Sequence, residues 1–263
     1  MDCAESLAPK PIRVGVYHEH RASASDKGCV DITLYLLNSQ RGIEGKQITS
    51  DEILAGKLSD FDVLILPGGM PKKQLNRITE KGMDLIRNFV AGGGGYIGVC
   101  AGAEAAACPR ENGWLGIAAV QALDERTKWG SGSGMADLST TPEFARIVGN
   151  GREEITMSFV NGPLLEHAVS DPSLPPVQVL ARFTDDLYSF DKRKRMAEAS
   201  INEKESIRMS AQAIRDVEMK GKLAVIATRY GSGQVVLFST HPELTSGQEE
   251  LFLKTVLWAA RLR

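Results

Sequence analysis

Short apolar runs that end in polar or glycine-rich turns alternate with amphipathic segments along much of the chain. Apolar runs that we expect to form buried strands lie at residues 12–17, 62–66, 96–99 and 234–239. Segments with apolar residues at helical spacing lie at 29–38, 76–91 and 248–262. This alternation predicts an α/β fold, doubly wound, with a mostly parallel sheet and a site at the carboxyl ends of its strands.

Weaker patterns complete the expected fold. Further strands are predicted at residues 46–49, 114–123, 155–160, 177–183 and 222–229. The last of these and the run at 234–239 flank a Tyr-Gly-Ser-Gly turn, which predicts a hairpin. A short helix is expected at 50–55, with Ser50 as its N-cap.

One segment departs strongly from this pattern. Residues 190–221 are heavily charged and helix-favouring, and they lie between two predicted strands. We interpret residues 1–263 as a single domain with a helical or disordered insertion at about 190–221. The insertion could be a lid, a partner-binding arm at 191–220, or an insertion tolerated at the surface, which is the default.

Composition narrows the classes of function. The chain has 263 residues, 43% of them hydrophobic, and a net charge of −2, so no basic field argues for nucleic acid or for an anionic membrane. No apolar run approaches the roughly 20 residues of a membrane span. The first eleven residues carry neither a basic start nor an apolar region, so no secretory signal is expected.

Cysteine usage points to a reducing compartment. The four cysteines form no CxxC motif and no paired zinc spacing: Cys3, Cys29, Cys100 and Cys108. We therefore expect a cytoplasmic protein with no cofactor and no bound metal. Cys29 is expected to pack in the first crossover helix rather than to take part in chemistry.

The strongest candidate for chemistry lies in residues 91–107, AGGGGYIGVCAGAEAAA. A strand that ends in Cys100 and turns at once into a helix is typical of a nucleophile elbow. Such a turn is crowded, and Gly98, Ala101 and Gly102 supply the small neighbours that it requires. The helix N-terminus would favour a thiolate. The alternative is a buried cysteine that closes a core strand.

A second motif supplies what a cysteine nucleophile needs. His241 and Glu243 directly follow an apolar strand, and Pro242 between them restricts the backbone. A nucleophile requires a base, and the base requires an acceptor that fixes its tautomer. The alternative reading of this motif is an ordinary helix-entry turn. Two weaker signals, His18 with His20 and the acidic pair at 185–186, are read as solvated loops.

Three segments together carry a resemblance to a known family: DVLILPGG (62–69), GYIGVCAGAEAA (95–106) and YGSGQVVLFSTHPE (230–243). The chain resembles the class I glutamine amidotransferase-like superfamily, whose fold is flavodoxin-like. It is most similar to the group of the biotin-protein ligase N-terminal domain. The resemblance covers residues 12–247 apart from the charged insertion.

The resemblance implies an acyl-transfer mechanism. Cys100 would be the nucleophile, His241 the general base and acid, and Glu243 the orienting carboxylate. The backbone N–H groups of Gly69 and Ala101 would form the oxyanion hole. In glutaminase domains the thiolate attacks a carboxamide, ammonia leaves, and the thioester is hydrolysed.

Other residues are expected to contact the substrate. Gly68 follows a buried strand, where backbone can approach a ligand closely. Asn161 lies in the turn after a predicted strand. Glu104 occupies the position of a substrate-contacting Gln in glutaminases, so it changes the charge and the hydrogen-bond donors offered to a ligand. No synthetase partner domain and no biotinyl-adenylate loop is recognised, so biotin ligation is not expected.

The sequence leaves three hypotheses. The first is a cysteine hydrolase or amidotransferase-like enzyme that acts on a small amide or acyl substrate. The second is a non-catalytic module that keeps the fold and binds a ligand or a partner through its pocket or through residues 191–220. The third is a peptidase-type or stress-response relative, in which Glu19 would lie near the cysteine; the His-Pro-Glu motif argues against it.

Overall fold

The computed structural model describes residues 10–19, 24–123, 133–148, 151–168, 173–184 and 219–260. Its strands are β1 (Ile12–Tyr17), β2 (Ile43–Ile48), β3 (Val63–Leu66), β4 (Gly95–Val99), β5 (Val120–Ala122), β6 (Ser133–Thr140), β7 (Glu154–Val160), β8 (Leu165–His167), β9 (Gln178–Phe183), β10 (Leu223–Tyr230) and β11 (Gly233–Phe238). Its helices are α1 (Ala24–Ser39), α2 (Ser50–Leu54), α3 (Pro71–Ala91), α4 (Ala101–Ala105), α5 (Pro142–Val148) and α8 (Glu249–Ala259), with 3-10 turns η1 (Lys57–Asp60), η2 (Arg110–Asn112) and η3 (Pro242–Leu244).

The described strands form one mixed sheet in the order β2-β1-β3-β4-β11-β10-β9-β6-β7, while β5 and β8 pair off this path. The first five strands in this order are all parallel to their neighbours. Their order is the flavodoxin-like 2-1-3-4-5 arrangement, so the predicted doubly wound fold with a parallel core is confirmed. From β11 outward the pairs are antiparallel, which the sequence did not predict beyond the β10–β11 hairpin.

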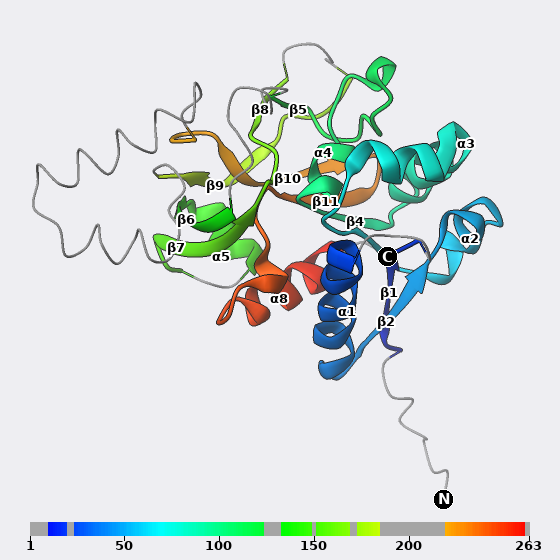
Figure 1. Ribbon diagram of the computed structural model, residues 1–263, viewed down its shortest axis with the longest axis horizontal. Helices are drawn as coiled ribbons and strands as arrows, with labels where there is room; N and C mark the ends of the chain where they lie inside the picture. The colour runs from blue at the N-terminus through cyan, green and yellow to red at the C-terminus, as the bar shows by residue number, and fades with distance from the viewer. Residues whose placement is uncertain are drawn as a thin grey trace, which may run out of the picture.

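Helices cover both faces of the parallel core (Figure 1). Along β11 the buried residues alternate between two hydrophobic clusters, with Val236 and Phe238 in one and Val235 and Leu237 in the other. The first cluster includes side chains of α1, α5 and α8, and the second includes side chains of α2, α3 and α4. Because successive side chains of a strand point to opposite faces, this alternation explains why the core strands are apolar throughout.

The structure corrects two sequence predictions. The strand expected at 114–123 is reduced to Val120–Ala122. Ser50 is not the N-cap of α2, because Thr49 takes that place in an extended conformation. The Thr49 side chain accepts from the backbone N–H of Glu52, and the Glu52 carboxylate accepts from the N–H of Thr49, a reciprocal capping box.

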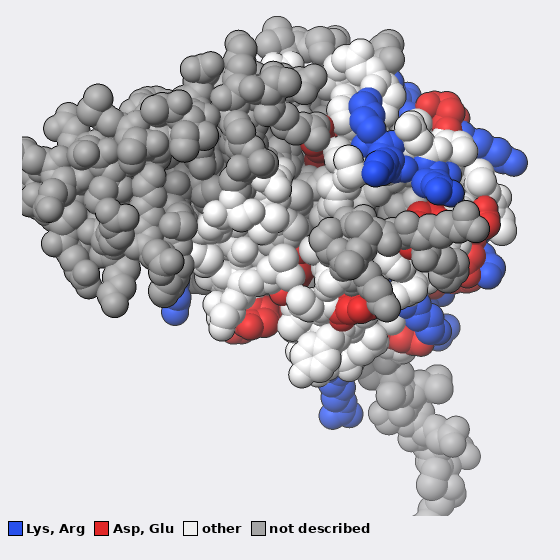
Figure 2. All heavy atoms as spheres, in the orientation of Figure 1, with Lys and Arg blue, Asp and Glu red and all other residues white. Residues whose placement is uncertain are grey.

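The surface charge and the helices of the described residues bear on the expectations drawn from composition. On the face shown in Figure 2, the described Lys and Arg side chains lie among Asp and Glu. Within the described ranges, no helix is long and apolar enough to cross a membrane. The charged insertion lies outside the described residues except for its end at 219–221, and so does the acidic pair at 185–186.

Candidate active site

The turn between β4 and α4 is strained at its cysteine. Cys100 has a φ of 52° and a ψ of −107°, a conformation that L-residues rarely adopt. A Cβ atom on Gly98 would lie 2.4 Å from the carbonyl oxygen of Gly102, and one on Gly102 would lie 1.9 Å from that of Leu66. The predicted need for small residues around Cys100 is therefore confirmed.

Parallel topology brings the candidate residues to one edge of the sheet. β4 lies between β3 and β11, so the turns that follow these three strands are neighbours. The N–H of Cys100 donates to the carbonyl of Phe238, the last residue of β11, at 2.8 Å. Cys100 is only 6% exposed, and its Sγ lies 3.5 Å from the carbonyl oxygen of Val160.

His241 and Glu243 form a buried hydrogen-bonded pair. His241 Nδ1 lies 2.7 Å from Glu243 Oε1, and both side chains are almost fully buried. The backbone of His241 is anchored on both sides, since its N–H donates to Ser158 O at 2.7 Å and its carbonyl accepts from Thr245 Oγ1 at 2.6 Å. The backbone thus fixes the imidazole in one place, as a general base requires.

Charge and hydrogen bonding stabilise the protonated form of this histidine. Burial by itself lowers the pKa of His241, but the negative charge of Glu243, the nearby thiols of Cys100 and Cys29 and the hydrogen bond with Glu243 outweigh it. The net result is a pKa well above the ordinary value of 6.5. An imidazolium held beside Cys100 would favour the thiolate form of its sulfur.

The second imidazole nitrogen is available for the cysteine. Glu243 occupies Nδ1, so Nε2 is the atom left for Cys100. Within the described part of the chain, Nε2 is buried and has no hydrogen-bond partner. Cys100 lies close enough to affect the pKa of His241, yet its sulfur points to Val160. The hydrogen bond between Cys100 and Nε2 is therefore not made in this structure, and such contacts are often loose before substrate binds.

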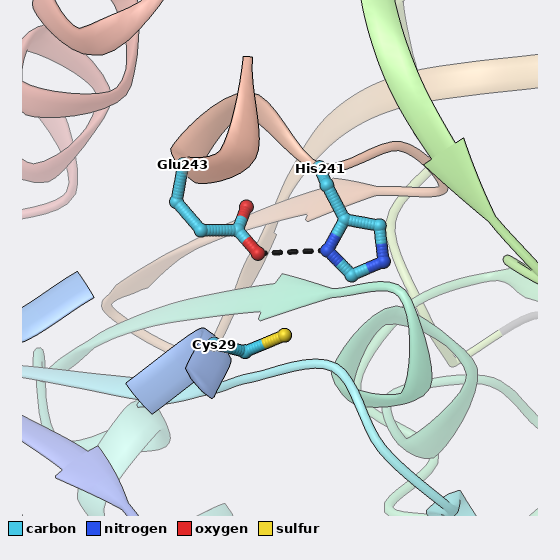
Figure 3. Close-up of side chains that lie close together, drawn as sticks. All are labelled: Cys29, His241 and Glu243. Carbon is cyan, nitrogen blue, oxygen red and sulfur yellow. Dashed lines mark hydrogen bonds and ion pairs between the residues drawn. The ribbon is translucent and has the colours of Figure 1, made fainter. Parts of the chain in front are cut away.

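Cys29 also lies at this site, which the sequence analysis did not predict. Figure 3 shows its sulfur, on α1, pointing towards the hydrogen-bonded His241 and Glu243. One ligand atom from each of these three residues lies within 4.8 Å of the others. The missed signal is topological: α1 follows β1, and a helix that follows a parallel strand begins at the carboxyl edge of the sheet.

The proposed oxyanion-hole residues lie in the expected turns. Ala101 is the first residue of α4, and the first N–H groups of a helix have no partner within it. Gly69 follows β3 with a φ of 150°, a value that favours glycine. Gly68 lies against the base, because a Cβ atom there would be 2.7 Å from His241 Cε1. Their role as donors stays a prediction.

The other predicted site residues are placed as follows. Glu104 is buried in α4, and its N–H donates to the carbonyl of Cys100 at 3.1 Å. Asn161 is exposed, with a φ of 50°, and it directly follows Val160, whose carbonyl faces Cys100. Both lie near the nucleophile, and substrate binding by them stays a prediction.

Glu19 is held by hydrogen bonds at the start of α2. Its Oε1 accepts from the Tyr17 hydroxyl at 2.9 Å and from the N–H of Ser50 at 2.9 Å, at the start of α2. Burial raises its pKa, but the hydrogen bonds with Ser50 and Tyr17 bring it below the ordinary value. This carboxylate therefore stabilises a helix start, and the peptidase-type hypothesis stays a hypothesis.

Substituting Gly68 tests whether His241 must stay in place. We expect Gly68→Ala to slow alkylation of Cys100 by about tenfold, because the new methyl group displaces the imidazole and misplacement of reacting groups by about 1 Å is costly. The measurement is the rate of iodoacetamide labelling of Cys100 by mass spectrometry. Gly151→Ala is the matched control, since a Cβ there meets nothing within 4 Å. Equal rates in the two variants would contradict the proposed contact.

Comparison with known proteins gives one family match and several similar folds. Residues 25–111 match the family model described as "Biotin-protein ligase, N terminal". This match supports the resemblance to the group of the biotin-protein ligase N-terminal domain over these residues. The matched residues include Cys29, the turn after β3 and the Cys100 elbow, but neither His241 nor Glu243. No curated protein matches the chain by sequence.

Solved structures support the same fold. PurLQS from Thermotoga maritima is similar with a TM-score of 0.61 and 17% identity, covering 95% of this chain and 99% of that chain. A putative ThuA-like protein from Bacteroides uniformis has a TM-score of 0.57 and 11% identity, covering 98% and 95%. A cytoplasmic protein from Salmonella typhimurium has a TM-score of 0.52 and 13% identity, covering 94% and 95%. At these identities the likeness shows the fold alone.

Proposed function

We propose that this protein is a cysteine-dependent hydrolase or amidotransferase-like enzyme that acts on a small amide or acyl substrate. The observation that supports the proposal is the strained turn at Cys100, whose N–H donates to Phe238 at the end of β11, three residues before the buried His241–Glu243 pair. A cysteine in a strained turn, a base within reach and a carboxylate on the base are the three parts of a nucleophilic triad.

In the proposed reaction His241 Nε2 takes the proton of the Cys100 thiol, and the thiolate attacks the carbonyl carbon of the substrate. The N–H groups of Gly69 and Ala101 would stabilise the oxyanion of the tetrahedral intermediate. His241 then returns the proton to the leaving nitrogen, which departs as ammonia or an amine. Water, activated by the same imidazole, hydrolyses the thioester and releases the acid and the free thiol.

Because Glu104 stands where glutaminases carry Gln, the substrates to be tested should include more than glutamine. Glutaminases of the resembled superfamily carry Gln at this position, and an ionised carboxylate offers acceptors only. The carboxylate lies in the same short helix that begins after the nucleophile. We propose a small-molecule substrate and a cytoplasmic location, because a reducing compartment keeps a thiol nucleophile active.

The test is whether an acyl group accumulates on Cys100. The full chain is mixed with 4-nitrophenyl acetate and with small primary amides, including glutamine, and acylation is followed by mass spectrometry and ammonia release. We expect acylation in the wild type and in Cys108→Ala, since Cys108 lies elsewhere, against the Val120 carbonyl. Cys100→Ala should show none. Acylation that persists in Cys100→Ala, or fails in the wild type, would favour the binding-module hypothesis.

A further inference from the structure

We propose that Cys29, His241 and Glu243 form a binding site for one Zn²⁺ ion, which holds the catalytic base in an inactive form. The three side chains come from two places far apart in the sequence, α1 and the turn after β11. His241 and Glu243 are buried and Cys29 is partly buried, and the ligand atoms of the three lie within 4.8 Å of one another (Figure 3).

The donor set is one that zinc prefers. Zn²⁺ binds thiolate sulfur, imidazole nitrogen and carboxylate oxygen at about 2.0 to 2.3 Å, and a soft thiolate ligand selects against Mg²⁺ and Ca²⁺. A tetrahedral ion with such bonds separates its ligand atoms by roughly 3 to 4 Å. The present spread of up to 4.8 Å therefore has to contract slightly, and the 2.7 Å contact between Nδ1 and Oε1 has to lengthen.

An unpartnered buried oxygen gives an independent indication of a ligand. Among the described residues, Glu243 Oε2 is buried without a hydrogen-bond partner. Buried polar atoms are nearly always paired, so an oxygen left over beside a thiol and an imidazole is unusual. A cation next to Glu243 would pair with this oxygen. Cys29 has no role in the proposed triad, so its place here is otherwise unexplained.

Zinc at this position would switch off the base. The ion would bind the Nδ1 side of the ring, where Glu243 now sits, and a neutral imidazole with a metal on Nδ1 keeps its proton on Nε2. Binding would release the thiol proton of Cys29 to solvent and, from an imidazolium, the Nδ1 proton as well. Nε2 would then be an N–H donor and could not accept the proton of Cys100. This consequence rests on the proposed function; the metal site itself does not.

Cobalt titration of the full chain tests the site. Metal-free, reduced protein is titrated with Co²⁺, whose bond to a thiolate gives a charge-transfer absorption in the near ultraviolet. We expect this band to saturate at one Co²⁺ per chain, to disappear on adding Zn²⁺ and to persist in excess Mg²⁺. Cys29→Ala should remove the band and weaken Zn²⁺ binding by about a hundredfold or more. The conservative Cys29→Ser variant should do the same, with circular dichroism showing that both are folded.

The other cysteines provide the decisive controls. Cys100→Ala and Cys108→Ala should both keep the cobalt band. A wild type without the band, a band retained in folded Cys29→Ala, or a band lost in Cys100→Ala would overturn the proposal, the last by placing the metal on the nucleophile. If the cobalt band forms but Cys100 is never acylated, the proposed function fails and the metal site stands. If Cys100 is acylated but no cobalt band forms, the proposed function stands and the metal site fails.

Discussion

Replacing His241 with alanine slows alkylation of Cys100 by roughly 10- to 100-fold at about pH 6. The raised pKa of His241 keeps the imidazole protonated at this pH, and a cation beside the sulfur favours the thiolate. An ordinary cysteine, with a pKa of about 8.5, is well under 1% thiolate at about pH 6. Because a more stable thiolate is also less nucleophilic, the rate changes less than the thiolate fraction does.

The pH profile separates this effect from simple loss of packing. In the wild type, labelling with iodoacetamide should stay fast well below about pH 8.5, whereas in His241→Ala it should rise through about that pH. His167→Ala is the matched control, since His167 is an exposed histidine at the end of β8, and it should keep the wild-type profile. Superimposable profiles for the wild type and His241→Ala would show that the two side chains are not coupled.

The parallel half of the fold could be predicted because each of its strands can be recognised from its own residues, without knowledge of its neighbours in the sheet. Strands buried on both faces read as continuous apolar runs, and β3 and β11 are buried at every position. β6 could not be predicted in this way, since Ser133–Thr140 has only two buried residues and is held by pairing with β7 and β9. Its structure depends on neighbours that are distant in the sequence, which propensity does not report.

The candidate site also has features that depend on local sequence and one that depends on the fold. The strained turn at Cys100 and the hydrogen bond between His241 and Glu243 could be predicted, because each motif contains its own chemical reason: a crowded turn, and a base with an acceptor two residues on. Cys29 could not, because a single cysteine in a helix is usually packing, and only the folded sheet brings α1 to the turn after β11. Gly68 was expected to approach a ligand, which stays a prediction; the structure adds that a Cβ atom there would lie 2.7 Å from His241 Cε1.

Gly102→Ala should have the largest effect on stability, lowering the free energy of unfolding by roughly 3 to 5 kcal/mol. The added Cβ would lie 1.9 Å from the carbonyl oxygen of Leu66, in the adjacent strand β3. The backbone fixes the position of the Cβ and the oxygen is itself a backbone atom, so no side-chain rotation relieves the clash and α4 has to move away from the sheet. Because α4 starts directly after Cys100, the same movement removes the nucleophile from its strained turn.

Gly28→Ala is the matched control, because it makes the same substitution within a helix at a place where a Cβ meets nothing within 4 Å. It should leave stability unchanged or raise it by up to about 1 kcal/mol, since alanine favours a helix more than glycine does. Urea unfolding of the two variants and the wild type measures the difference. A Gly102→Ala midpoint equal to that of Gly28→Ala would mean that the helix can leave β3 at no cost. The turn would then lack the rigidity that holds Cys100 against His241, and the case for a preorganised nucleophile would fail with it.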